Sequence, residues 1–184
     1  MITKGKTSSI AGTLYLATSA VIAALYVVLT LPFAQFAFGP IQFRLAEIMV
    51  VLPILTPAAI PGLTLGCFLA NLLNPMNLGV IDIVFGSLAT LIAAVLTRWI
   101  ILKTIRISAR PRDILALVPP VIINAVIVGI YLSYLLTDGP VTALLIAMNI
   151  LYVGLSEAAV VYALGFPFLL VLRKTNIERI WQKN

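Results

Sequence analysis

The chain has 184 residues, of which 62% are hydrophobic and only 10% are charged, and its mean hydropathy is +1.15. Soluble domains carry about 25% charged residues, so this composition excludes an ordinary soluble domain and indicates a protein that lies mostly in lipid. The net charge of +6 does not indicate nucleic-acid binding, because the basic residues lie in short clusters between apolar segments, as membrane topology requires.

Six apolar segments approach the length of about 20 residues that a membrane-spanning helix needs. We predict spans at residues 11–31, 44–55, 60–74, 80–102, 114–136 and 141–172, within a single membrane domain of residues 1–184. The first span is longer than the core of a signal peptide, and the second is short and contains Pro53. The last is too long for one straight crossing, so either Gly165-Phe166-Pro167 bends it or its first turns lie along the interface. Residues 173–184 are predicted to form a short cytoplasmic tail.

The distribution of basic residues predicts the orientation of this bundle. With six spans, both termini lie on one side, together with the loops at 56–61 and 103–112. That side holds eleven of the twelve Lys and Arg residues. Because loops that carry the basic excess stay cytoplasmic, we expect both termini in the cytoplasm. The remaining basic residue, Arg44, stands alone at the opposite face.

Polar side chains from five spans are predicted to converge on one layer near that opposite face. An ionisable side chain at the centre of a bilayer costs about 2.5–3.5 kcal/mol on insertion scales, so each one is a candidate functional residue. Glu157 is the strongest candidate, because it lies in mid-span with no basic residue nearby in the sequence. An apolar pocket with a few polar groups is typical of small-molecule sites. The predicted layer contains Arg44, Glu47, Asn71, Asn74, Asp82, Tyr131, Tyr134, Asn149, Tyr152 and Glu157, under an aromatic loop at 32–43 that includes Phe43; Asn124 lies deeper.

Purely structural roles also fit most of these residues. Arg44 and Glu47 are three residues apart and can pair with each other on one helix face, and Asp82 can stabilise a helix N-terminus. Asparagines such as Asn71 and Asn149 commonly form interhelical hydrogen bonds, and tyrosines commonly lie in the interfacial belt. Two further patterns, Ala20 with Ala24 and Gly62 with Gly66, place small residues four apart, which favours close packing within the chain or against a partner.

Several of these segments resemble the QueT family, the substrate-binding S-components of energy-coupling factor (ECF) transporters that are assigned to queuosine precursors. The segments are Phe38-Gly39-Pro40-Ile41-Gln42-Phe43-Arg44-Leu45-Ala46-Glu47, Thr56-Pro57-Ala58-Ala59-Ile60-Pro61-Gly62, Gly66-Cys67-Phe68-Leu69-Ala70-Asn71-Leu72-Leu73 and Ile81-Asp82-Ile83-Val84-Phe85-Gly86-Ser87-Leu88-Ala89-Thr90.

The resemblance implies a six-helix bundle in a prokaryotic plasma membrane that binds a micronutrient at its outer side. It implies partners, namely the membrane scaffold subunit EcfT and two cytoplasmic ATPases, and no cofactor or metal. Ala20 and Ala24 match the Ala-x-x-x-Ala face by which such proteins contact the scaffold. The implied substrate is a 7-deazaguanine, with the aminomethyl compound preQ1 first and the cyano compound preQ0 and queuine as alternatives.

The chemistry of the candidate residues suits such a ligand. Carboxylates accept the adjacent N–H groups of the ring edge, and amide or guanidinium groups donate to its carbonyl. Glu47, Asp82 and Glu157 are the acceptors, and Arg44, Asn71 and Asn149 are the donors; the ring is expected to stack on Phe43 or on a tyrosine such as Tyr152. Which carboxylate contacts which edge stays open. If Arg44 neutralises Glu47, the cationic aminomethyl group is expected to pair with Asp82 or Glu157 instead.

Three other functions are weaker interpretations. A stand-alone proton-coupled transporter of a nucleobase-like or vitamin solute would use Glu157 or Asp82, but no inverted repeat supports it. The chain is not predicted to be an enzyme, because it has no histidine, no HExxH, no Gly-x-Ser-x-Gly and no P-loop. A purely structural bundle would not explain three carboxylates inside the membrane.

Overall fold

The computed structural model describes residues 4–34, 44–74 and 78–175, with side chains from residue 12 onward. Across these ranges the chain is helical and contains no strand, which confirms the predicted all-α membrane bundle. Four helices are long and apolar enough to cross a membrane by length and composition: Gly12–Phe33, Val80–Lys103, Ala109–Leu135 and Ala143–Lys174. Two shorter apolar helices, Leu45–Ile54 and Ala59–Leu73, complete the six predicted segments.

The first helix, α1 (Lys4–Thr30), packs along α4 (Ala59–Leu73) and ends in a 3-10 turn, η1 (Leu31–Phe33). Two glycines of α4 allow the two backbones to approach closely. A Cβ on Gly66 would lie 2.6 Å from the Cβ of Tyr26, and one on Gly62 would lie 2.8 Å from the Cβ of Ile22. The Gly62–Gly66 pattern therefore serves packing within the chain.

The predicted second span is not an α-helix over most of its length. It consists of a 3-10 helix, η2 (Leu45–Val51, 7 residues), followed by α3 (Leu52–Leu55, 4 residues), with Pro53 in the first turn of α3. At about 2.0 Å per 3-10 residue and about 1.5 Å per α residue, the segment is roughly 20 Å long. It is too short to cross a hydrocarbon core of about 30 Å. Its apolar side chains are instead buried inside the bundle.

The middle of the chain forms two long helical arms. Gly79 has a φ of 91°, a conformation that glycine adopts readily, and α5 (Val80–Lys103) begins directly after it. The next arm is made of α6 (Ala109–Ala116) and α7 (Val118–Leu135), which meet at Leu117. It begins earlier than the predicted residue 114, because the polar turn at Arg110–Arg112 is helical as well.

The last span was predicted either to bend at Gly165-Phe166-Pro167 or to begin along the interface. In the structure, this last arm contains a π-helical segment that ends at Gly165. It runs from α8 (Ala143–Ala158) through η3 (Ala159–Gly165), which is π-helical, into α9 (Phe166–Lys174). Pro167 lies in the first turn of α9 and has no N–H to donate to the preceding turn. The widened segment lies immediately before this proline, and such π segments are frequent at functional sites.

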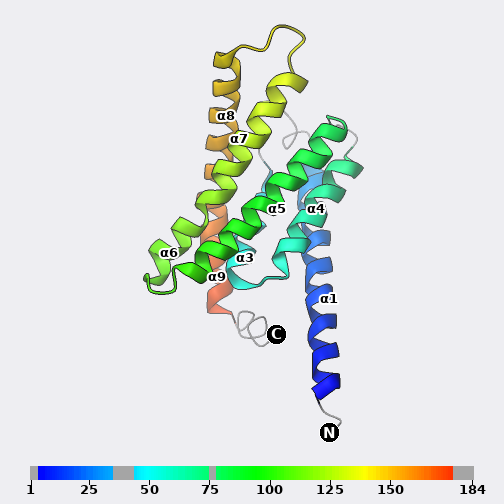
Figure 1. Cartoon of the computed structure of the whole chain (residues 1–184), viewed down its shortest axis with the longest axis vertical. Helices are drawn as coiled ribbons and strands as arrows, with labels where there is room; N and C mark the ends of the chain where they lie inside the picture. Colours follow the sequence, from blue (N-terminus) through cyan, green and yellow to red (C-terminus); the bar gives the residue numbers. More distant parts are fainter. Residues whose placement is uncertain (1–3, 35–43, 75–77, 176–184) are drawn as a thin grey trace.

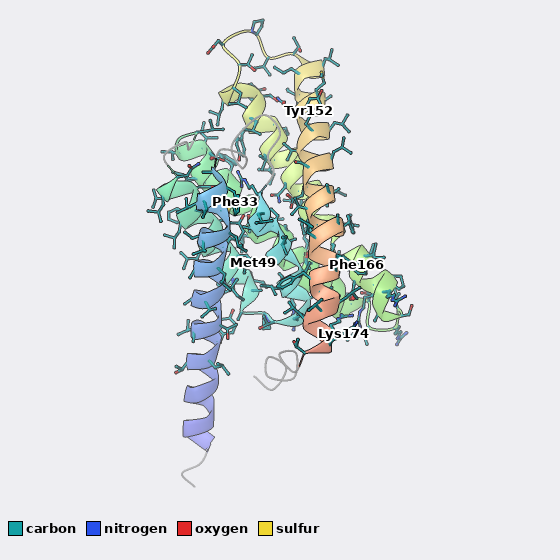
Figure 2. The ribbon with its side chains drawn as sticks, turned by 180° about the vertical axis from the view of Figure 1, so that it is seen from behind. Phe33, Met49, Tyr152, Phe166 and Lys174 are labelled. Carbon is teal, nitrogen blue, oxygen red and sulfur yellow. The ribbon has the colours of Figure 1, made fainter. Side chains whose placement is uncertain are left out.

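Five helices and the short buried segment form a closed ring of contacts. α1, α4, α5, α7 and α8 contact one another in that order, and η2 closes the ring by packing against both η3 and α1. In Figure 1, the start of α1 lies toward the same end of the bundle as α6 and α9. The α7–α8 connection lies at the other end. Seen from behind, Met49 of η2 lies between α1 and the last arm (Figure 2). Residues 35–43 and 176–184, which include most of the predicted aromatic loop and tail, lie outside the described residues.

Candidate functional site

Arg44 and Asp82 form a buried ion pair between the start of η2 and the first turn of α5. The distance from Arg44 Nη2 to Asp82 Oδ1 is 3.7 Å, and both side chains are almost fully buried. The hydroxyl of Tyr131 on α7 donates a 2.6 Å hydrogen bond to the same Oδ1. Asn71 on α4 donates from Nδ2 to the backbone carbonyl of Asp82 at 3.2 Å. Three helices therefore hold Asp82 in place, and its Oδ2 is buried with no hydrogen-bond partner among the described residues.

Glu47 projects from η2 and is only 1% exposed. Tyr26 on α1 donates a 2.6 Å hydrogen bond from its hydroxyl to Glu47 Oε1. Within the described part of the chain, the other oxygen, Oε2, is buried and accepts no hydrogen bond. Arg44 acts on this carboxylate electrostatically as well, although the ion pair given above joins Arg44 to Asp82. The Arg44–Glu47 pairing that the sequence suggested is therefore not the main contact of either side chain.

Glu157 lies in the last turn of α8, two residues before the π-helical segment begins. It is 7% exposed, and Asn124 on α7 donates a 3.0 Å hydrogen bond to its Oε1. Glu157 interacts electrostatically with both Glu47 and Arg44. The third carboxylate therefore belongs to the same buried cluster as the first two.

The cluster gathers one arginine and three carboxylates inside an apolar bundle. Its four charged members are Arg44, Glu47, Asp82 and Glu157, and its neutral members are Tyr26, Asn71, Asn124 and Tyr131. Buried charges are costly unless paired or hydrogen-bonded, and the carboxylates outnumber the single cation. The arrangement is suited to receive N–H donors and positive charge from a ligand.

Other predicted site residues lie elsewhere. Asn149 donates a 2.9 Å hydrogen bond to Ser133 Oγ, which joins α8 to α7. Tyr152 is 41% exposed on α8, and Tyr134 is 61% exposed on α7. Phe43 lies outside the described residues. The structure therefore brings together six residues of the predicted layer: Arg44, Glu47, Asn71, Asp82, Tyr131 and Glu157.

Sequence reasoning missed two members of the cluster. Tyr26 was not singled out, because a tyrosine near the end of an apolar helix is usually interfacial. Asn124 was predicted to lie too deep to join the layer, yet it contacts Glu157. A polar residue in mid-span is itself a signal, and that signal could have identified Asn124 as a member of the site.

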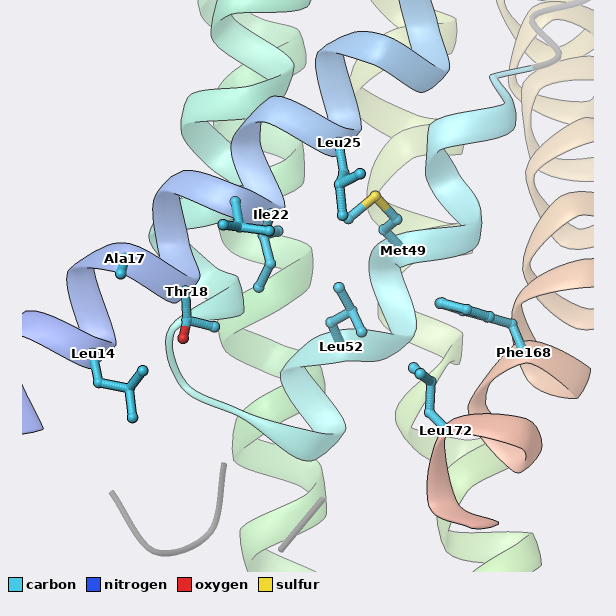
Figure 3. Close-up of a pocket in the computed structure, with 10 residues that line it drawn as sticks. Leu14, Ala17, Thr18, Ile22, Leu25, Met49, Leu52, Phe168 and Leu172 are labelled. Atoms are coloured by element: carbon cyan, nitrogen blue, oxygen red, sulfur yellow. The ribbon is translucent and has the colours of Figure 1, made fainter. Parts of the chain in front are cut away.

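The face of α1 that carries Ala20 and Ala24 is exposed, on the side away from α4. One turn before Ala20, Ala17 lines an apolar groove of about 400 Å³. Figure 3 shows this groove between α1, the η2–α3 segment and α9, with Met49 and Phe168 on its far side. The Ala20–Ala24 pattern therefore points away from the chain's own core, unlike Gly62 and Gly66.

A bundle of long apolar helices around a buried charged cluster defines a multi-pass membrane protein with an intramembrane site, as transport proteins have. The model of the family described as "QueT transporter" matches residues 16–174, so the chain belongs to the QueT transporter family. That family is described as one of transporters.

A curated relative is similar over part of the chain. The "Queuosine precursor transporter QueT" of Lactococcus lactis subsp. cremoris (strain MG1363) is 35% identical over 77 residues. The match covers 41% of this chain and 44% of the relative, so it spans less than half of either protein. No solved structure matches the chain significantly.

Proposed function

We propose that the chain is the substrate-binding S-component of an ECF importer, and that its substrate is a 7-deazaguanine precursor of queuosine. The observation that carries this proposal is the buried cluster, in which Glu47 Oε2 and Asp82 Oδ2 have no hydrogen-bond partner among the described residues. An unsatisfied buried polar group costs about 1–3 kcal/mol. Ligand N–H groups would remove that cost, so the cluster is better suited to a bound state than to an empty one.

The ring edge of a deazaguanine presents a carbonyl beside two N–H donors. The Arg44–Asp82 pair offers the complementary order, because a guanidinium donor lies beside a carboxylate acceptor. In the proposed complex the ring carbonyl accepts from Arg44 and the N–H groups donate to Asp82 Oδ2. Tyr131 and Asn71 hold Asp82 in position for this contact.

The energy for transport would come from partner subunits. The sequence has no P-loop, so ATP hydrolysis is assigned to two cytoplasmic ATPases that act through the scaffold EcfT. The exposed Ala20–Ala24 face and the adjoining apolar groove support a scaffold contact on α1. The start of α1 lies at the same end of the bundle as α6 and α9 (Figure 1). This arrangement supports a topology with both termini in the cytoplasm, in a prokaryotic plasma membrane.

Titration of the purified protein with preQ1, queuine and guanine tests the substrate. Heat or tryptophan fluorescence reports binding, since the chain has two tryptophans. We expect a deazaguanine to bind more tightly than guanine. Absence of binding by protein that is shown to be folded would contradict the assigned substrate.

Uptake in cells tests the energising partners separately. We expect accumulation of labelled substrate to stop when the scaffold gene or both ATPase genes are deleted. Uptake that continues in these strains, and that collapses with the proton gradient, would instead support the stand-alone proton-coupled transporter.

A further inference from the structure

The short buried segment made of η2 and α3 is joined to α5 at both of its ends. At its start, Arg44 Nη2 lies 3.7 Å from Asp82 Oδ1 in the first turn of α5. At its other end, α3 packs against α5. There the guanidinium of Arg98 donates from Nη1 to the backbone carbonyls of Pro53 and Ile54, each at 3.3 Å. The ion pair of the candidate site and the Arg98 contact therefore connect the same two elements.

The sequence after α3 explains why these two carbonyls need a donor from another helix. In a continued α-helix, the carbonyl of Pro53 would accept from the N–H of residue 57, and that of Ile54 from the N–H of residue 58. Pro57 has no N–H, and the N–H of Ala58 donates instead to a threonine hydroxyl at 3.3 Å. Both carbonyls belong to buried residues, and a buried carbonyl without a partner is costly.

Arg98 does more than add to the basic residues at this end of the bundle. It lies in the last two turns of α5, which ends at Lys103. Long basic side chains near the ends of membrane helices commonly extend toward the interface. Arg98 is half-buried and directs its guanidinium at the backbone of the buried segment, whereas Lys103 is exposed. Arg98 therefore fastens α3 to α5.

The two contacts are separated by almost the whole length of the buried segment. From Asp82 to Arg98, α5 rises about 24 Å at 1.5 Å per residue, and the segment itself is roughly 20 Å long. The segment is too short to reach both interfaces, so its position along the bundle depends on contacts such as these. A slip by one 3-10 residue would move Arg44 by about 2 Å, whereas a binding site needs its groups placed within about 0.5 Å.

We propose that Arg98 is a positioning residue for the substrate site, which acts by fixing the buried segment along α5 so that Arg44 and Glu47 meet the ligand beside Asp82. This inference rests on the proposed function and adds a residue that does not itself touch the ligand. Coupling between two sites is reciprocal. If the Arg98 contact raises substrate affinity, bound substrate must strengthen the Arg98 contact by the same factor.

The first test measures affinity by titrating the full-length protein with preQ1 and queuine. We expect Arg98→Met to bind about tenfold more weakly, because two charge-assisted hydrogen bonds are lost. Binding should stay measurable, since Tyr26 still holds Glu47. Arg98→Lys should restore affinity to within about threefold, because an ammonium can donate to the same carbonyls. Lys103→Met is the matched control: it removes one exposed positive charge from the same helix and should leave affinity unchanged.

The second test uses the unchanged protein and reads the far end of the segment by hydrogen–deuterium exchange. The N–H of Thr56 donates to the Leu52 carbonyl at 2.9 Å, so its exchange reports opening of α3. By reciprocity, saturating preQ1 should slow exchange within residues 52–56 by about tenfold. Residues 109–116 of α6, at the same end of the bundle (Figure 1), should be slowed much less. In Arg98→Met, the slowing at 52–56 should disappear.

The outcomes separate this inference from the proposed function. If preQ1 binds but Arg98→Met keeps full affinity, or if residues 52–56 are slowed no more than α6, Arg98 does not position the site, and a deazaguanine-binding protein remains. If Arg98→Met does not fold, exchange in the unchanged protein decides. If the unchanged protein binds neither preQ1 nor queuine, the proposed function fails and the positioning role with it.

Discussion

The hydroxyl of Tyr26 donates a 2.6 Å hydrogen bond to Oε1 of Glu47 and thereby joins α1 to the buried 3-10 helix η2. The Cβ of Tyr26 also packs against α4, where Gly66 leaves room for it. On its side away from α4, α1 exposes Ala20 and Ala24. One helix therefore supports the charged cluster on its inner face and carries the proposed partner contact on its outer face.

The first prediction concerns this hydrogen bond. Tyr26→Phe removes the donor from a carboxylate whose other oxygen already lacks a partner. We expect the free energy of unfolding to fall by about 1–3 kcal/mol, because a buried acceptor is left unsatisfied. Thermal unfolding followed by labelling of Cys67 measures the change. Tyr134→Phe alters an exposed tyrosine and should have no effect on stability. If Tyr26→Phe leaves the free energy of unfolding unchanged, another group must donate to Glu47.

The second prediction tests the contact between α1 and α4. Gly66→Ala would place a methyl group 2.6 Å from the Cβ of Tyr26 and 3.1 Å from the Ala23 backbone. The two helices must then separate, which we expect to cost about 1–3 kcal/mol. Gly12→Ala is the matched control, since a Cβ there meets nothing within 4 Å and alanine favours the helix by up to about 1 kcal/mol. Equal stability of the two variants in detergent unfolding would contradict the packing.

The third prediction concerns the exposed face of α1. Ala20→Leu combined with Ala24→Leu adds bulk outside the chain's own core, so substrate affinity and thermal stability should not change. If this face contacts the scaffold, uptake by cells should be lost, because the helices can no longer approach closely. Ala147→Leu, an exposed alanine on α8, should leave uptake intact. Normal uptake in the double variant would move the partner contact to another surface.

The fourth prediction addresses the end of the bundle away from the cluster. Arg173 on α9 forms an ion pair with the buried Asp113 on α6, with a 2.9 Å hydrogen bond from Nη2 to Oδ1. Arg173→Gln leaves that carboxylate with the longer 3.9 Å contact to Arg112. Breaking a fully buried pair costs about 3–5 kcal/mol, and since Arg173 is partly exposed we expect about 1–3 kcal/mol here. Lys174→Gln, which changes the exposed neighbouring cation, should leave the unfolding temperature within error.

The sequence by itself determined the membrane class, the approximate positions of six apolar segments and the candidate charged residues. Segment length and hydropathy are local properties, and the cost of placing a charge in lipid applies to each residue separately. For these reasons Glu47, Asp82 and Glu157 were recognisable before any contact was known. The boundaries of the 80–102 and 141–172 segments agree with the structure to within two residues.

Only the tertiary structure decided which side chains meet. Asp82 pairs with Arg44, Tyr26 with Glu47, and Asn124 with Glu157, and these partners lie far apart in the chain. Such pairings depend on the rotation and depth of each helix, which packing against neighbours determines and hydropathy does not. The 3-10 geometry of η2 and the π-helical η3 also escaped the sequence, because burial within the bundle, more than local propensity, stabilises them. The buried charged cluster is therefore a property of the assembled bundle.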